Sequence, residues 1–116
     1  MPLSSEDKEF AQYVVDLMQS IGPVNAKRMF GGYGVFLDGL MFALIADGLL
    51  YFKVDKENQS QFIENDLPPF TYFKKDKECK MSYYLSPEDA LEDADIMNTW
   101  GNAAYAAALR AAAQKK

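Results

Sequence analysis

The sequence contains no histidine and one cysteine, Cys79, among its 116 residues. Without histidine, the chain lacks the most common general base near neutral pH and the most common metal ligand. A single cysteine cannot form a disulfide within the chain, which predicts a reducing compartment, the cytoplasm. Cys79 alternates with Met81, Tyr83 and Leu85 at strand spacing. We therefore interpret its thiol as a packed side chain and not as a nucleophile.

Membrane and export signals are also missing from the sequence. The first ten residues hold no basic segment followed by an apolar stretch, and every longer apolar run is interrupted by Asp-Gly or lysine. We predict neither export nor insertion, and we expect no membrane partner.

Positive charge is scarce, with 12 Lys and Arg against 17 Asp and Glu, a net charge of -5. Nucleic-acid-binding domains usually carry a basic stripe that neutralises phosphates, and a pI near 4.6 does not supply one. Direct binding to nucleic acid by the chain alone is therefore disfavoured. The 49% hydrophobic content suits one globular domain, which we expect to span residues 1–116.

The first half of the chain changes from a helix pattern to a strand pattern. Ser4 and Ser5 precede two acidic residues, and apolar residues then recur at helical spacing, which predicts a helix over residues 5–21, ended by Gly22-Pro23. Asp38-Gly39 and Asp47-Gly48 are typical hairpin turns and predict a three-stranded meander. Its middle strand is apolar throughout, which favours cover on both faces, in part by a second chain.

The second half predicts a short helix capped by Asp55, a hairpin of residues 70–74 and 79–85, and a helical segment from Ser86 to Lys116 with a break near Asp93. Trp100 is interpreted as a large core residue of that last segment. The resulting order, α-β-β-β-α-β-β-α, is an α+β fold of two layers, with an antiparallel five-stranded sheet and helices packed on one face.

Glycines interrupt the apolar strand that follows Lys27 and Arg28, and they predict a bend or bulge there. The run lacks the Lys-Ser/Thr of a phosphate loop and does not open a helix, so we do not interpret it as a nucleotide site. Cations and aromatic residues beside a shaped backbone are typical of a contact surface. The predicted partner-binding residues are Lys27, Arg28, Phe30, Gly31, Gly32, Tyr33 and Gly34.

Lysines gather around the second hairpin, among aromatic residues, and two interpretations remain open. Such a surface can stack nucleic-acid bases, although Asp76 and Glu78 dilute its charge. Lysine at the edge of a sheet also prevents aggregation, which we favour. The candidate residues for weak nucleic-acid binding are Lys74, Lys75, Lys77 and Lys80.

The densest carboxylate group, from Glu88 to Asp95, lies where a helix is predicted to start. Acidic residues stabilise the positive end of a helix without any further role. We therefore predict no metal site, no catalytic residues and no cofactor.

A set of short segments runs in order over nearly the whole chain: Arg28–Gly34, Asp38-Gly39, Met41–Asp47, Leu50–Asp55, Pro69-Phe70, Met81–Tyr84 and Trp100. In these segments the sequence resembles the amino-terminal domain of the TfoX/Sxy family of competence regulators. The resemblance implies a bacterial transcriptional regulator of natural transformation that acts beside the cyclic AMP receptor protein and is not an enzyme. Full-length members carry a second, helical domain, which has no counterpart before Lys116, so we expect a stand-alone domain.

Three hypotheses for the function follow. The first is a non-enzymatic cytoplasmic interaction module of transcriptional regulation, whose partner is a transcription factor such as a cyclic AMP receptor-type protein. A homodimer is a further candidate. The alternative is a small-molecule-binding protein or an unrecognised enzyme that uses an aromatic pocket, and the third is a weak direct DNA binder.

Overall fold

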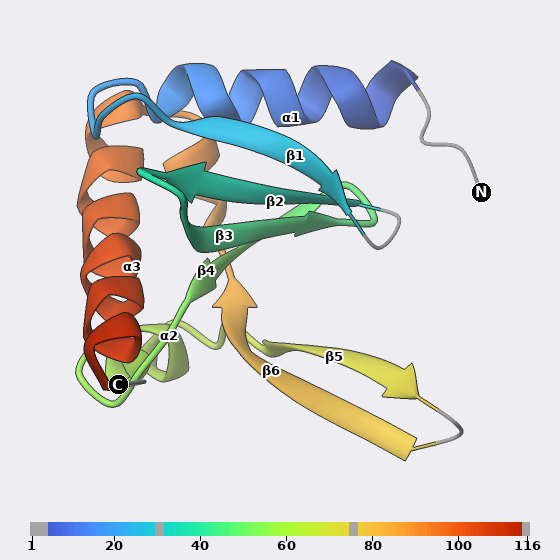
Figure 1. Ribbon diagram of the computed structural model, residues 1–116, viewed down its shortest axis with the longest axis vertical. Coiled ribbons are helices and arrows are strands. Elements are labelled where there is room, and N and C mark those ends of the chain that lie inside the picture. The colour runs from blue at the N-terminus through green and yellow to red at the C-terminus, as the bar shows by residue number, and fades with distance from the viewer. Residues whose placement is uncertain (1–4, 30–31, 75–76, 115–116) are drawn as a thin grey trace.

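The computed structural model describes residues 5–29, 32–74 and 77–114, with the backbone alone for residues 5, 6 and 72–81 (Figure 1). Its helices are α1 (Ser5–Leu17), α2 (Gln59–Glu64) and α3 (Ala94–Gln114), with a 3-10 helix η1 (Glu88–Leu91). Its strands are β1 (Asn25–Met29), β2 (Gly32–Leu37), β3 (Leu40–Ala46), β4 (Leu49–Lys53), β5 (Pro69–Lys74) and β6 (Lys77–Leu85).

The strands form one antiparallel six-stranded sheet in the order β1-β2-β3-β4-β6-β5. The predicted α+β class and antiparallel sheet are confirmed, but the sheet has six strands and not five. The difference lies in the glycine-containing run, which we had interpreted as one strand with a bend. It folds as two strands, since β1 pairs back on β2 with Met29 opposite Gly32.

A bulge does occur in this part of the sheet, but between β2 and β3. Val35 pairs with Ala43 and Phe36 with Met41, so β3 has one extra residue, Phe42. Both Phe42 and Ala43 are buried as a result. A bulge of this kind increases the local twist of the sheet.

The two hairpin turns predicted from the sequence are confirmed. Asp38-Gly39 joins β2 to β3, with φ angles of 52° and 77°, and Asp47-Gly48 joins β3 to β4, with φ angles of 54° and 74°. Two successive residues of positive φ are typical of the type I′ turn, which favours Asp-Gly.

Buried residues from the helices and one face of the sheet form the core. Val14 and Met18 contribute from the first helical region, Phe62 from α2 and Met97 from α3. The face that these elements cover is called the inner face below, and the opposite one the outer face. Alanines at positions 104, 107 and 108 of α3 are buried as well, and their small side chains let the helix approach the sheet closely.

Three boundaries correct or confirm the sequence interpretation. Helix α1 ends at Leu17, four residues before the predicted end, and turns replace it up to Ile21. The break near Asp93 is confirmed, because its carboxylate accepts the amide protons of Asp95 and Ile96 at the start of α3. Asp55 does not cap α2, whose N-cap residue is Asn58.

Candidate interaction surface

The register of the sheet assigns each strand residue to a face, because residues directly opposite each other in antiparallel strands project from the same side. One row of opposite residues crosses five strands. It consists of Lys27, Gly34, Leu44, Tyr51 and Leu85. None of these residues belongs to the core cluster, so this row marks the outer face.

A second row crosses the sheet one position along the strands. It consists of Ala26, Val35, Ala43, Phe52, Tyr84 and Pro69. Val35, Ala43 and Phe52 are core residues, and Ala26 and Tyr84 pack against them. This row therefore lies on the inner face.

The two neighbouring cations of the predicted surface consequently project from opposite faces of β1. Lys27 lies opposite Gly34 on the outer face, whereas Arg28 lies opposite Tyr33 on the inner face. Tyr33 is 8% exposed and belongs to the core, so its ring supports the sheet from within. Gly32, opposite Met29, shares the outer face. Phe30 and Gly31 lie outside the described residues.

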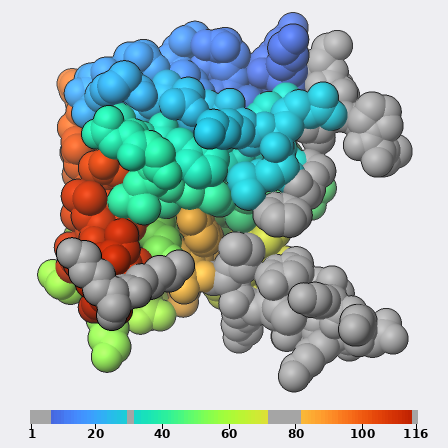
Figure 2. Space-filling model, viewed as in Figure 1, coloured from blue at the N-terminus to red at the C-terminus, as the bar shows by residue number. Residues whose placement is uncertain are grey.

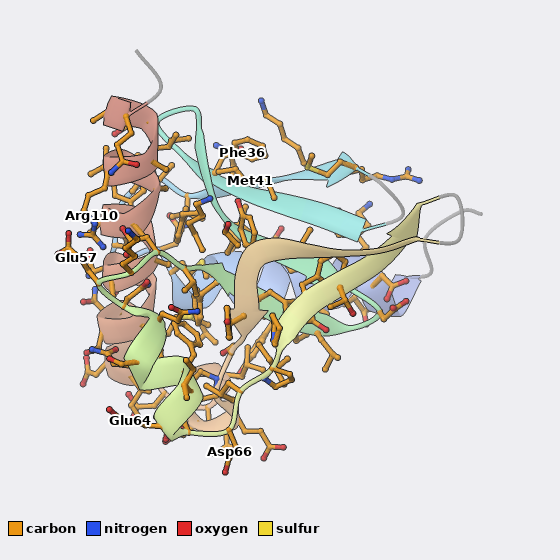
Figure 3. The ribbon with its side chains drawn as sticks, turned by 90° about the horizontal axis from the view of Figure 1, so that it is seen from below. Phe36, Met41, Glu57, Glu64, Asp66 and Arg110 are labelled. Atoms are coloured by element: carbon orange, nitrogen blue, oxygen red, sulfur yellow. The ribbon has the colours of Figure 1, made fainter. Side chains whose placement is uncertain are left out.

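Gly34 forms the floor of a small apolar cluster on the outer face. A Cβ atom at this position would lie 2.5 Å from Met29 Sδ, 2.9 Å from Phe36 Cε1 and 3.1 Å from Met41 Sδ. These three side chains therefore fold over the glycine, and Figure 3 shows Phe36 and Met41 beside each other. All three are partly exposed. Together with Lys27 and Gly34 they make up what we call the outer patch.

Lys27 supplies the charge of the outer patch. Its Nζ lies 5.2 Å from the centre of the Phe36 ring, an arrangement in which the face of the ring attracts a cation. Lys27 and Arg28 are both exposed. The sequence has no acidic residue between Asp16 and Asp38, so this part of an acidic chain carries a local positive excess. Figure 2 shows β1 and β2, in cyan to green, at the surface of the molecule.

Aromatic residues continue the outer face toward β6. The Tyr51 ring packs edge-on against Phe70, with centres 5.0 Å apart. Lys53 Nζ lies 5.4 Å from the centre of the Tyr83 ring, and Tyr83 is 7% exposed. Burial raises the pKa of the Tyr83 hydroxyl to about 12. Burial, with a smaller effect of Asp47, also raises the pKa of Tyr51.

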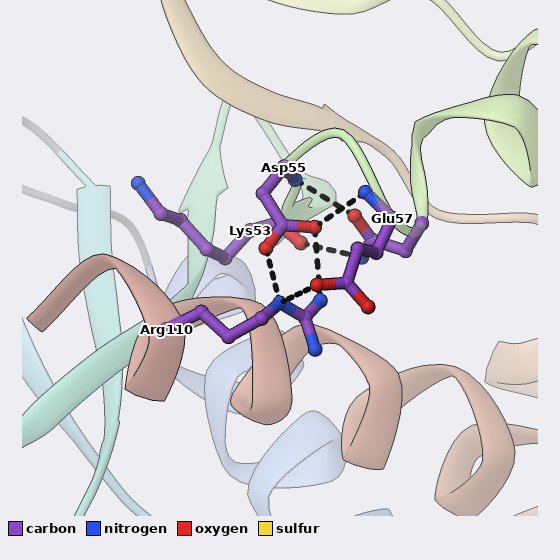
Figure 4. Close-up of polar contacts among 5 residues, drawn as sticks. Lys53, Asp55, Glu57 and Arg110 are labelled. Carbon is purple, nitrogen blue, oxygen red and sulfur yellow. Dashed lines mark hydrogen bonds and ion pairs between the residues drawn. The ribbon is translucent and has the colours of Figure 1, made fainter. Parts of the chain in front are cut away.

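The strongest polar cluster, which the sequence did not reveal, joins the segment before α2 to α3 (Figure 4). Arg110 donates to both carboxylate oxygens of Asp55, at 2.5 and 2.9 Å, and its Nε lies 3.2 Å from Glu57. The hydrogen bond from Arg110 lowers the pKa of Asp55. Asn58 completes the cluster by accepting the Asp55 amide proton and donating to the Lys53 carbonyl. Asp55 and Arg110 lie 55 positions apart, and no local pattern pairs them.

The lysines of the second hairpin are placed only by their backbone. Lys74 lies opposite Lys77 at the end of the β5–β6 hairpin, and Lys80 lies opposite Thr71. Lys75 lies outside the described residues, as do the side chains of the other three and of Cys79. Nucleic-acid binding by these lysines stays a prediction.

Four aromatic residues between the helices and the sheet are in contact with one another. The Phe62 ring packs against Phe52, Tyr84 and Trp100, with ring centres 6.5, 5.7 and 5.0 Å apart. Trp100 is partly buried and thus joins α3 to α2. Among the residues that the structure describes, no three histidine, cysteine or acidic side chains gather as metal ligands do. No helix in the described ranges is long and apolar enough to cross a bilayer.

The fold and the surface define a small α+β domain. Its described polar clusters connect elements of the domain itself, and the outer face of its sheet carries an apolar patch beside a lysine. Residues 16–108 match the family model of the TfoX N-terminal domain, well over half of the chain. The chain therefore belongs to the TfoX N-terminal domain family, as the resemblance had implied.

Two curated relatives are similar to this chain. The "DNA transformation protein TfoX1" of Aliivibrio fischeri is 32% identical over 69 residues, which cover 60% of this chain and 33% of the relative. "Protein Sxy" of Escherichia coli is 23% identical over 73 residues, which cover 63% of this chain and 35% of the relative. The chain thus matches about a third of the length of each relative.

Proposed function

We propose that the chain is a non-enzymatic, cytoplasmic interaction module that acts in transcriptional regulation through a protein partner, in a process such as natural competence. The match of residues 16–108 to the TfoX N-terminal domain carries this proposal. The name of one relative, a DNA transformation protein, supports the process. Because the chain corresponds to only part of each relative, the role of the whole relatives is extended to it as a proposal.

The partner that we propose is a transcription factor of the cyclic AMP receptor type, by resemblance to the family. The net charge of -5 supports a division of labour in which that partner makes the DNA contacts. The exposed cations of β1 and the apolar residues beside them support a contact between proteins.

The experiment has a physical part and a cellular part. Purified chain is titrated with the purified cyclic AMP receptor-type protein of the same bacterium, and complex formation is followed by calorimetry. In the cell, transcripts of DNA-uptake genes are compared with the gene of this chain deleted and then restored. We expect a complex, and transcripts that fall on deletion and recover on restoration. Unchanged transcripts would reject the regulatory role, and the absence of a complex would reject this partner.

A further inference from the structure

We infer that the outer patch docks an acidic segment of a partner protein, anchored by an apolar side chain of that segment. The inference rests on the proposed function, because it specifies the chemistry of the partner that the module would recognise. It concerns a face of the sheet that lies outside the core cluster.

Apolar contact is the first part of the argument. Met29, Phe36 and Met41 are partly exposed and converge over Gly34, where two thioether sulfurs and a ring edge would meet a Cβ atom. Thioethers are flexible and polarisable, so they adapt to an incoming apolar side chain. Because Gly34 has no side chain, these three groups pack directly against the strand and present their partly exposed surfaces to solvent.

The positive charge of Lys27 indicates that the docked segment is acidic. Lys27 lies over the Phe36 ring at the edge of the patch and has no ion-pair partner among the described residues. Of the acidic groups nearest along the chain, Asp16 lies in α1, on the inner side of the sheet, and Asp38 lies in the hairpin turn between β2 and β3. The molecule as a whole is acidic. An acidic segment is therefore attracted at this patch and repelled by much of the remaining surface, which directs its docking.

The chain itself offers a matched control for this charge. Arg28 is the next residue along β1, is also exposed, and projects from the opposite face. Lys27→Glu and Arg28→Glu therefore make the same change in net charge on the same strand. Any difference between them reports the face and not the overall charge.

The test selects peptides from a displayed pool of random twelve-residue sequences against the immobilised chain. We expect the recovered peptides to be net acidic and to carry Phe, Leu or Trp. Their affinity should fall about tenfold or more for Lys27→Glu and for Phe36→Ser, as expected for a residue central to an interface. It should change by less than about twofold for Arg28→Glu and for Leu109→Ser, which alters an exposed apolar residue of α3. Circular dichroism melting confirms that each variant folds.

Other results would overturn the inference. Recovery of no peptides, or of basic or neutral ones, would remove the acidic partner. Equal losses for Lys27→Glu and Arg28→Glu would mean that overall charge and not the outer patch governs binding. A dimer in sedimentation experiments that Phe36→Ser dissociates would assign the face to a second copy. Salt-sensitive binding of duplex DNA that only Lys27→Glu abolishes would assign it to nucleic acid.

Peptide binding and the regulatory role can fail separately. If acidic peptides bind the outer patch but transcript levels do not change when the gene is deleted, the outer patch is supported as a binding site and the proposed function is rejected. Transcripts that respond to deletion but are unaffected by Lys27→Glu would retain the function and reject the outer patch as its site.

Discussion

At the scale of single residues, two glycines of β2 differ in what a side chain would meet. A Cβ atom at Gly32 would lie 2.1 Å from the backbone carbonyl oxygen of Ile45, so β2 and β3 would have to move apart. At Gly34 it would lie close to side-chain atoms only, the Sδ atoms of Met29 and Met41 and Cε1 of Phe36, and these partly exposed groups can move outward. We expect Gly32→Ala to lower the free energy of unfolding by about 2 kcal/mol, and Gly34→Ala by roughly 1 kcal/mol or less.

Urea denaturation of the two variants and the wild type measures this difference. Replacing glycine by alanine lowers the conformational entropy of the unfolded chain. This effect stabilises both variants equally, so it cancels when they are compared. Equal stability of the two variants would contradict the close approach of Ile45 to Gly32.

Asp55 makes a second prediction at this scale, because its pKa is lowered by Arg110 from an ordinary value of 3.8. The folded chain then binds fewer protons than the unfolded chain in the window between the two pKa values. Stability from this carboxylate is therefore present above the unfolded pKa and is lost as pH falls through the folded pKa. We expect Asp55→Asn to lower the melting temperature near pH 7, and the difference from wild type to shrink below about pH 4.

Glu57→Gln is the control, because Glu57 is largely exposed and reaches Arg110 through a single contact of 3.2 Å. Thermal melts of the three proteins across the acidic range make the comparison. A melting-temperature difference for Asp55→Asn that stays constant down to low pH would show that the ion pair does not account for it.

At the scale of secondary-structure elements, the small side chains on one side of α3 determine how closely the helix approaches the sheet. Ala104 is fully buried, whereas Ala112, two turns later, is exposed. Ala104→Leu adds volume to a filled core and should lower the free energy of unfolding by about 1–3 kcal/mol. Ala112→Leu makes the same chemical change in solvent and should alter it by less than about 0.5 kcal/mol.

Chemical denaturation of both variants tests the contact between α3 and the sheet. Similar losses at the two positions would mean that helix propensity, and not packing, explains the effect. Burial at positions 104, 107 and 108 explains why small residues occupy one side of this alanine-rich helix.

At the scale of the whole molecule, the folded unit extends beyond the part that matches the family. The match begins at residue 16, yet Ala11 and Val14 of α1 are buried in the core. The Tyr13 hydroxyl also donates to the carbonyl of Leu91, which joins α1 to η1. We therefore expect a chain that begins at residue 16 to lose several kcal/mol of stability, since burial of a side chain such as Val14 contributes about 1.5–3 kcal/mol and Phe10 and Ala11 add to it.

Calorimetric melts compare that shortened chain with one that ends at Gln114, from which only the last two residues are removed. The first should melt much earlier or without a cooperative transition, and the second should melt as the full chain does. An unchanged transition after removal of α1 would show that the matched region folds by itself.

Much of this architecture follows from local signals in the sequence. The Asp-Gly turns, the break at Asp93 and the second hairpin were all predicted because each depends on neighbouring residues. The sixth strand was missed because the two residues between Met29 and Gly32, which pair with each other, are Phe-Gly and not the Asp-Gly that marks the other two hairpin turns. The pairing of Asp55 with Arg110 was missed because only the folded chain brings them together.

The sequence prediction of a contact surface did not assign its residues to the two faces of the sheet. Apolar and charged residues on one stretch of sequence indicated a contact region, and Lys27 and Gly34 do share a face. Arg28 and Tyr33 project to the other side, and Tyr33 is buried. The prediction treated the run as a single strand, and only the pairing of β1 with β2 and the position of the helices separate its two faces.

Because side chains alternate along β1, neighbouring codons specify residues on opposite faces of the sheet. Codons 25, 27 and 29 specify the outer side of the sheet, whereas codons 26 and 28 specify the side that meets the helices. Substitutions at the first set therefore change the outer face while Ala26, in the second set, keeps its contact with the core. Insertion or deletion of one codon in this strand would exchange the two sets together, so the strand should accept substitutions over time much more readily than changes in length.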